Sequence, residues 1–188
     1  MRKLLAVGVA VALFVVVSFA ADGVKMSPAK MALLSKVSQK IAQWGHDPAI
    51  VAAVRAQNAK AVSVAELKKI NAAWSAGGEE QLAISMLQGP CADRLHQFVS
   101  QGAFTEAFVM DERGANACMT NRTTYYWRGE MPKFQKAFDN GKGAVFIDEP
   151  KWDESAKARL VQVSVPVVDG GKAIGVLTVG VNADALGN

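Results

Sequence analysis

Three aromatic rings and one guanidinium occupy consecutive positions in the segment Tyr125-Tyr126-Trp127-Arg128. Neighbouring side chains on a helix point in different directions, so these four cannot all enter one apolar core. Aromatic walls with a few placed polar groups are typical of small-molecule pockets, and a guanidinium matches a carboxylate. Asn121, Tyr126, Trp127 and Arg128 are therefore candidate ligand-binding residues. In the alternative interpretation, Tyr126 and Trp127 fill space against a sheet while Arg128 is solvated.

Strand alternation supplies two more polar candidates. In the run 160–168, alternate valines point to one face, so Gln162 and Ser164 share the other face. Pro166 on that same face indicates a sheet edge or a bulge, because proline cannot donate a ladder hydrogen bond. If the face lines a cavity, Gln162 and Ser164 contact the ligand.

Asp148 ends a second expected strand, residues 144–148. It either anchors an ammonium group, which together with Arg128 would suit a zwitterionic ligand, or it is a strand-end carboxylate in a turn. A calcium site is the other chemistry that the local acids allow, but their spacing matches no EF-hand loop. We expect those acids to be solvated: Asp148, Glu149, Asp153 and Glu154.

Catalytic and nucleic-acid functions find little support in the sequence. The two histidines, His46 and His96, lie in the helical half, and there is no Cys/His metal spacing or nucleophile-elbow pattern. The net charge is +4, with basic residues scattered rather than clustered, so a nucleic-acid partner is not implied. We expect neither an enzyme nor a bound cofactor.

The elements that must position these residues are a helical half followed by a sheet. Apolar runs at 108–110 and 115–119 flank an Asp-Glu-Arg-Gly turn and predict a hairpin. A helix-like insertion at 123–138 follows, then the strand at 144–148. Two further strands meet at Asp169-Gly170-Gly171. Before the sheet, N-cap signals and apolar stripes predict helices starting at Ser27-Pro28, Asp47-Pro48 and Ser63, with Trp44 and Trp74 as core residues.

Taken in order, four segments resemble the Cache family of extracytoplasmic sensor domains, which are PAS-like, and in particular its stand-alone periplasmic members. The segments are FVMDERGAN, TTYYWRGEMPKFQKAF, VFIDEPKWDES and QVSVPVVDGGKAIGVLTVGVN. The resemblance implies an α+β fold in which an N-terminal helical segment packs along the back of a five-stranded antiparallel sheet. It also implies a ligand pocket between the helical insertion and the open face of the sheet.

The departures from the family pattern bear on the ligand. Related proteins typically read Asp-Tyr-Trp-Gln-Gly-Asp here, so Tyr126, Trp127 and Gly129 match, whereas Tyr125, Arg128 and Glu130 do not. The change removes an acid and adds a cation near the expected pocket mouth. A carboxylated ligand is therefore favoured.

The first residues, with a basic start, a long apolar run and Ser18-Phe19-Ala20, predict a secretory signal peptide over residues 1–20 with cleavage near Ala20. A retained membrane anchor is the alternative. Residues 21–188 are then one domain, helical over 21–100 and a sheet with a helical insertion over 101–188. The mature protein is expected to be periplasmic or secreted.

Cys91 and Cys118 are the two cysteines of the sequence. Export favours a disulfide between them, and two buried free thiols are the alternative.

These features predict an exported sensor domain for a small organic ligand, carboxylated or amino-acid-like. Its expected partners are a membrane-bound signalling or transport protein of the envelope and, in a homodimer, a second copy of the chain. The alternative is a structural or interaction module of the cell envelope that keeps this fold without a ligand.

Overall fold

The computed structural model describes residues 15–16, 26–153 and 157–186. Helices fill the first part of the chain, and they begin where the sequence predicted. Ser27 caps the first helix by accepting a hydrogen bond from the Lys30 amide, and Ser63 caps the third by accepting one from Glu66. The helices are α1 (Pro28–Trp44), α2 (Pro48–Asn58), α3 (Val64–Ser75), α4 (Glu80–Met86) and α5 (Pro90–Val99).

An antiparallel sheet follows, with the strand order β3-β2-β7-β6-β4. The short strand β5 (Lys151–Asp153) also pairs with β6, and β1 (Val15–Val16) pairs in parallel with β4. The main strands are β2 (Phe104–Asp111), β3 (Asn116–Met119), β4 (Val145–Ile147), β6 (Ala158–Asp169) and β7 (Lys172–Asn182). The predicted α+β class with its five antiparallel strands is confirmed, with two short strands added. β1 falls within the expected signal peptide, the rest of which lies outside the described residues.

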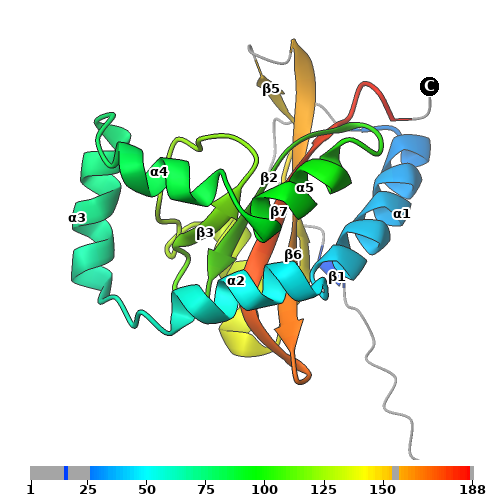
Figure 1. The fold of residues 1–188 in the computed structure, drawn as a ribbon. Coiled ribbons are helices and arrows are strands. Elements are labelled where there is room, and N and C mark those ends of the chain that lie inside the picture. The colour runs from blue at the N-terminus through cyan, green and yellow to red at the C-terminus, as the bar shows by residue number, and fades with distance from the viewer. Residues whose placement is uncertain (1–14, 17–25, 154–156, 187–188) are drawn as a thin grey trace, which may run out of the picture.

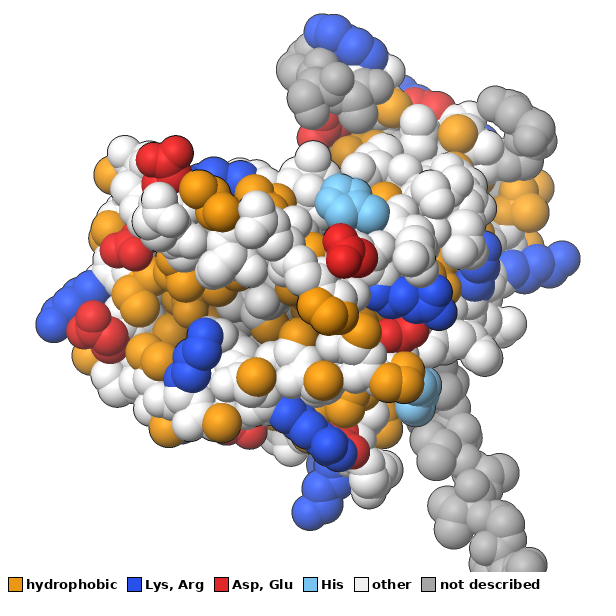
Figure 2. Space-filling model, viewed as in Figure 1, with side chains coloured by type: hydrophobic (Ala, Val, Ile, Leu, Met, Phe, Trp, Pro, Cys, Tyr) orange, Lys and Arg blue, Asp and Glu red, His pale blue; other side chains and the backbone are white. Residues whose placement is uncertain are grey.

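The two faces of the sheet carry separate apolar cores. Helices α1, α2 and α5 cover one face, as Figure 1 shows: α1 and α2 pack on the alternate valines of β6, and α5 packs on β2 and β3. The other face, with Phe108, Phe146 and Val176, packs against α6 (Pro132–Phe138) and against Tyr126 and Trp127. On the helical side drawn in Figure 2, basic and acidic side chains are interspersed. The sheet is therefore covered on both faces.

The resemblance implied that the N-terminal helical segment packs along the back of the sheet. Only part of the segment does so. α1, α2 and α5 do so, but Leu67 and Trp74 of α3 and Met86 of α4 belong to the second core. Trp44 and Trp74 are both buried, as predicted, but in different cores. The helical segment thus reaches both sides of the sheet.

The insertion at 123–138 is helical only over Pro132–Phe138, with a 3-10 turn at Asp139–Gly141. The expectation of a continuous helix was wrong because backbone pairing with the hairpin turn holds residues 126–128 extended. The Asn116 amide donates to the Tyr126 carbonyl at 2.9 Å, and the Arg128 amide donates to the Gly114 carbonyl at 2.8 Å. Pro132 then opens the helix, a position where its missing N–H costs no hydrogen bond.

Two further sequence features have structural counterparts. Pro166 lies beyond the short β4 pairing, which involves Val163 and Ser164, and a register shift follows it between Val167 and Val168.

Cys91 and Cys118 form a disulfide with their α carbons 6.2 Å apart, which ties α5 to β3. Within the described residues, no helix is both long enough and apolar enough to cross a membrane.

Candidate functional site

Two adjoining cavities lie on the face of the sheet that carries α6. The first, here called the Arg128 cavity, has a volume of about 210 Å³ and is walled by Phe108, by residues 122–125 and by Arg128. The second, the Asp148 cavity, has a volume of about 280 Å³ and is walled largely by residues 148–153. Glu106, Lys133 and Gln162 line both cavities. The two cavities therefore meet at these three side chains.

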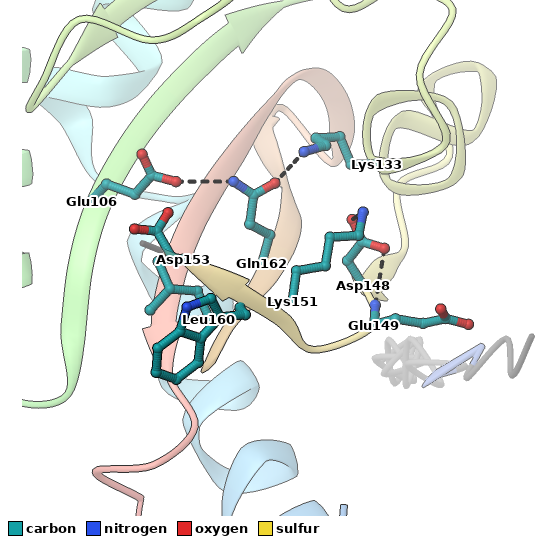
Figure 3. A pocket seen from close by; sticks show the side chains of 9 residues that line it. Glu106, Lys133, Asp148, Glu149, Lys151, Asp153, Leu160 and Gln162 are labelled. Atoms are coloured by element: carbon teal, nitrogen blue, oxygen red, sulfur yellow. Dashed lines mark hydrogen bonds and ion pairs between the residues drawn. The ribbon is translucent and has the colours of Figure 1, made fainter. Parts of the chain in front are cut away.

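The three shared side chains form a hydrogen-bonded bridge, drawn in Figure 3. The Gln162 Nε2 donates to Glu106 Oε1 at 2.9 Å, and Lys133 Nζ donates to Gln162 Oε1. Gln162, Gly180 and Glu106 are direct neighbours across β6, β7 and β2. A Cβ at Gly180 would lie 2.8 Å from the Glu106 Cγ. The bridge spans β7 because residue 180 has no side chain.

Arg128 is the most unusual group in the site. Its side chain is 5% exposed, its Nη1 donates to Asn116 Oδ1 at 2.9 Å, and its guanidinium lies 4.3 Å from the Phe108 ring centroid. Among the described residues, no carboxylate lies within ion-pair distance of it. Burial lowers the pKa of Arg128 to about 10, although Glu106 acts in the opposite direction. The group stays charged at neutral pH and faces a cavity.

The two cavities differ in charge. Arg122, Arg128 and Lys133 face Glu106 in the Arg128 cavity, so cations prevail there. Burial lowers the pKa of the Lys133 ammonium, while Asp148 and Glu106 raise it. The Asp148 cavity instead gathers more acids than bases, with Lys133 and Lys151 set against Glu106, Asp148, Glu149 and Asp153.

Tyr126 and Trp127, which the sequence placed in the pocket, line neither cavity. They are 2% and 8% exposed and belong to the second core. The Tyr126 hydroxyl accepts a hydrogen bond from Gln57 Nε2 at 3.0 Å, and the Trp127 Nε1 donates to the Arg113 carbonyl at 2.7 Å. The two rings thus fill space against the sheet, but Arg128 beside them is buried rather than solvated.

The other predicted residues either line a cavity, are buried in the sheet, or are exposed away from both cavities. Gln162 lines both cavities, and Asp148 lines the one named after it, where it also lies 3.7 Å from Lys151 Nζ. Ser164 is fully buried, shares a hydrogen bond of 2.9 Å with Thr178, and lines neither cavity. Asn121 is exposed and also lines neither. The structure therefore places Arg128, Gln162 and Asp148 along the two adjoining cavities, here together called the groove.

Sequence reasoning missed Glu106, Lys133 and Arg122. The hairpin strand was expected to start at Phe108, whereas β2 starts at Phe104. Alternation puts Glu106 on the same face as Phe108, so extending the strand by a few residues would have revealed it. Nothing in the sequence marks Lys133 among the other scattered lysines.

Helix α3 fixes the wall of the Arg128 cavity. Asn71 Oδ1 accepts hydrogen bonds from the amides of Tyr126 and Trp127, each at 3.0 Å. The Trp74 Nε1 donates to the Thr123 carbonyl at 2.7 Å, and Arg122 donates back to the Trp74 carbonyl at 3.1 Å. The wall is therefore held at several points before any ligand binds.

The acids at 148–154 are the residues for which the sequence allowed a calcium site as an alternative. In the described part of the chain, no group of three or more His, Cys, Asp or Glu side chains is placed to hold a metal ion. Glu154, the last of the acids considered, lies outside the described residues.

The layout that the sequence resemblance implied is present: an antiparallel sheet, a helical insertion after its second main strand, and a cavity between the two. No protein-family model matches the sequence, and no similar curated protein was found.

Solved structures with a similar fold are sensory and ligand-binding domains. The sensor domain of the V. cholerae histidine kinase DctB is 16% identical with a TM-score of 0.48, covering 84% of this chain and 51% of that one. The ligand-binding domain of the Pseudomonas aeruginosa amino acid chemoreceptor PctC, in complex with GABA, is 17% identical with a TM-score of 0.42, covering 81% and 62%. The sensory domain of the Campylobacter jejuni chemoreceptor Tlp3, with isoleucine bound, is 14% identical with a TM-score of 0.39, covering 86% and 66%.

The chain spans between about half and two thirds of the length of these structures.

Proposed function

We propose that the protein is an extracytoplasmic sensor domain that binds a small organic anion, a carboxylate or an amino-acid-like molecule, in the Arg128 cavity. The observation that carries the proposal is the buried Arg128 guanidinium, which faces the cavity with no carboxylate of the described residues within ion-pair distance, although Glu106 of the same cavity acts on it from further away. Burying an unpaired charge is costly, and a paired one far less so. A ligand carboxylate would supply the missing counter-charge.

An amino-acid-like ligand also suits the other charges of the cavity. Glu106 is the acid among its lining residues, and its carboxylate accepts one hydrogen bond, from Gln162. A ligand ammonium has a natural partner there, while Arg122 and Lys133 add to the attraction for the carboxylate. No catalytic group takes part in this proposal.

The bound state must then be reported to another protein. We infer that the partner is a signalling or transport protein of the envelope, reached after export of the chain and cleavage near Ala20. The solved domains with a similar fold come from a histidine kinase and from chemoreceptors. A partner of the same class is proposed for this chain.

A second candidate is a ligand-free structural or interaction module of the envelope. The burial of Tyr126 and Trp127 in the second core favours it, because these rings stabilise the fold instead of lining a pocket. The modest cavity volumes of about 210 and 280 Å³ favour it too, since ligand pockets usually exceed about 300 Å³.

Thermal unfolding with a panel of small metabolites separates the two candidates. A ligand that binds the native state at one hundred times its dissociation constant stabilises it by about 2.7 kcal/mol. We expect amino acids or short organic acids to raise the melting temperature, and their amides, which lack the carboxylate charge, to do so less. A melting curve that none of the acids moves would leave the structural module as the better account.

A further inference from the structure

We propose that Gln162 sets the length of the ligand that this groove accepts, an inference that rests on the proposed function because it concerns the same site. The Gln162 amide joins Glu106 on one side to Lys133 on the other, and each of the three side chains lines both cavities. In Figure 3, Gln162 lies between these two partners. The hydrogen-bonded bridge is therefore the partition between the Arg128 cavity and the Asp148 cavity.

The partition is thin because of the residue beneath it. Gly180 stands between Gln162 and Glu106 in the sheet register and contributes no side chain. An added Cβ there would lie 2.8 Å from the Glu106 Cγ, so the Glu106 side chain occupies the place of a side chain at residue 180 and can meet Gln162 across β7. Shortening residue 162 removes the central link and joins the cavities.

The two ends of the joined groove would carry opposite charges. One end holds the Arg128 guanidinium and Arg122, and the other is lined by the acids of the segment 148–153. A flexible chain with a carboxylate at one end and an ammonium at the other fits such a groove. In the intact protein, the bridge confines a ligand to the Arg128 side, where Glu106 must accept the ammonium. Only short ligands can then satisfy both of their charges.

Straight-chain ω-amino acids test this directly: β-alanine, γ-aminobutyrate, δ-aminovalerate and ε-aminocaproate. Calorimetric titration would compare the wild type with Gln162→Ala and Gln162→Asn. The asparagine variant keeps the amide but is too short to reach both partners. Gln135→Ala serves as the matched control, because Gln135 is an exposed glutamine of α6 that lines neither cavity.

We expect wild-type affinity to fall as the ligand lengthens, and ε-aminocaproate to bind Gln162→Ala at least about tenfold more tightly than it binds the wild type. Pockets discriminate by about 10- to 200-fold for a change of one methylene, so this gain lies at the low end. Gln162→Asn should shift the preference in the same direction by a smaller factor. Gln135→Ala should keep the wild-type order of affinities.

The outcomes distinguish failure of this inference from failure of the proposed function. If the wild type binds short acids and both Gln162 variants keep the wild-type order, Gln162 does not set ligand length, while the proposed function stands. If the wild type binds none of the four ω-amino acids but an acid of the thermal panel stabilises it, this inference fails and the proposed function stands; if no acid of either set binds, both fail. Circular dichroism of each variant shows that it is folded. If Gln162→Ala is unfolded, the asparagine variant decides the question.

Discussion

Arg128→Met tests the main step of the functional argument, because it removes the charge and keeps much of the volume. Burial depresses the pKa of Arg128 to about 10, and a depression of that size corresponds to about 3 kcal/mol of unfavourable desolvation. The replacement also loses the hydrogen bond to Asn116 and the contact with the Phe108 ring. Those two losses together cost about 2 kcal/mol.

The two effects nearly cancel, so unliganded Arg128→Met should be as stable as the wild type, or up to about 1 kcal/mol more stable. Ligand-induced stabilisation should instead disappear, since a charge-assisted hydrogen bond is worth about 1.5 to 3 kcal/mol. Urea denaturation with and without a bound acid measures both quantities in one experiment. Arg113→Met is the matched control, because Arg113 is half-buried nearby, donates to the Val62 carbonyl, and lines neither cavity.

Two results would contradict this reasoning. A loss of more than about 2 kcal/mol in the unliganded variant would mean that Arg128 is a structural residue already balanced by its surroundings. Undiminished stabilisation of Arg128→Met by the acid would place the ligand carboxylate elsewhere. A loss of ligand response in Arg113→Met as well would show a general effect of charge rather than a contact in the cavity.

Three further predictions concern the scaffold. Tyr126→Phe removes the hydroxyl that accepts a hydrogen bond from the buried Gln57 Nε2 at 3.0 Å. Urea denaturation should show that the free energy of unfolding falls by about 1 to 3 kcal/mol, and an unchanged value would mean that water replaces the hydroxyl. Burial raises the pKa of Asp111 above 3.8, so its stability contribution falls as pH rises from that value through the folded-state pKa. Asp111→Asn should flatten this part of the melting temperature profile, and an unchanged profile would assign the titration to another group. Replacing Cys91 and Cys118 by alanine removes a disulfide of sequence separation 27, so the free energy of unfolding should fall by about 3.5 kcal/mol. Two thiols that can be alkylated in the oxidised wild type would contradict the disulfide.

Local signals in the sequence predicted the scaffold because the physics that sets them is local. The helix starts at Ser27, Asp47 and Ser63 depend on caps a few residues long, and each side chain accepts the expected amide hydrogen bond. The long strands β6 and β7 follow from alternation and from the Gly170-Gly171 turn, both of which act between neighbours.

The wall of the cavity could not be predicted in this way. The segment 123–131 has a helix-like composition, but backbone groups of residues 114–116 hold residues 126–128 extended, and Asn71 of α3 binds the amides of Tyr126 and Trp127. Those partners come from distant parts of the sequence, so local propensity is overridden by tertiary pairing. The same pairing sends Tyr126 and Trp127 into the core and leaves Arg128 at the cavity.

The distant contacts that defeat sequence prediction also prepare the site for binding. The Arg128 amide is held by Gly114, its guanidinium by Asn116, and the adjoining wall by α3. Because these groups are already fixed, a ligand would not have to order a loop, and that cost is a large part of what weakens small-ligand binding. A cavity of about 210 Å³ offers few contacts. Under the proposed function, recognition by so small a site would therefore depend on charges that are in place beforehand.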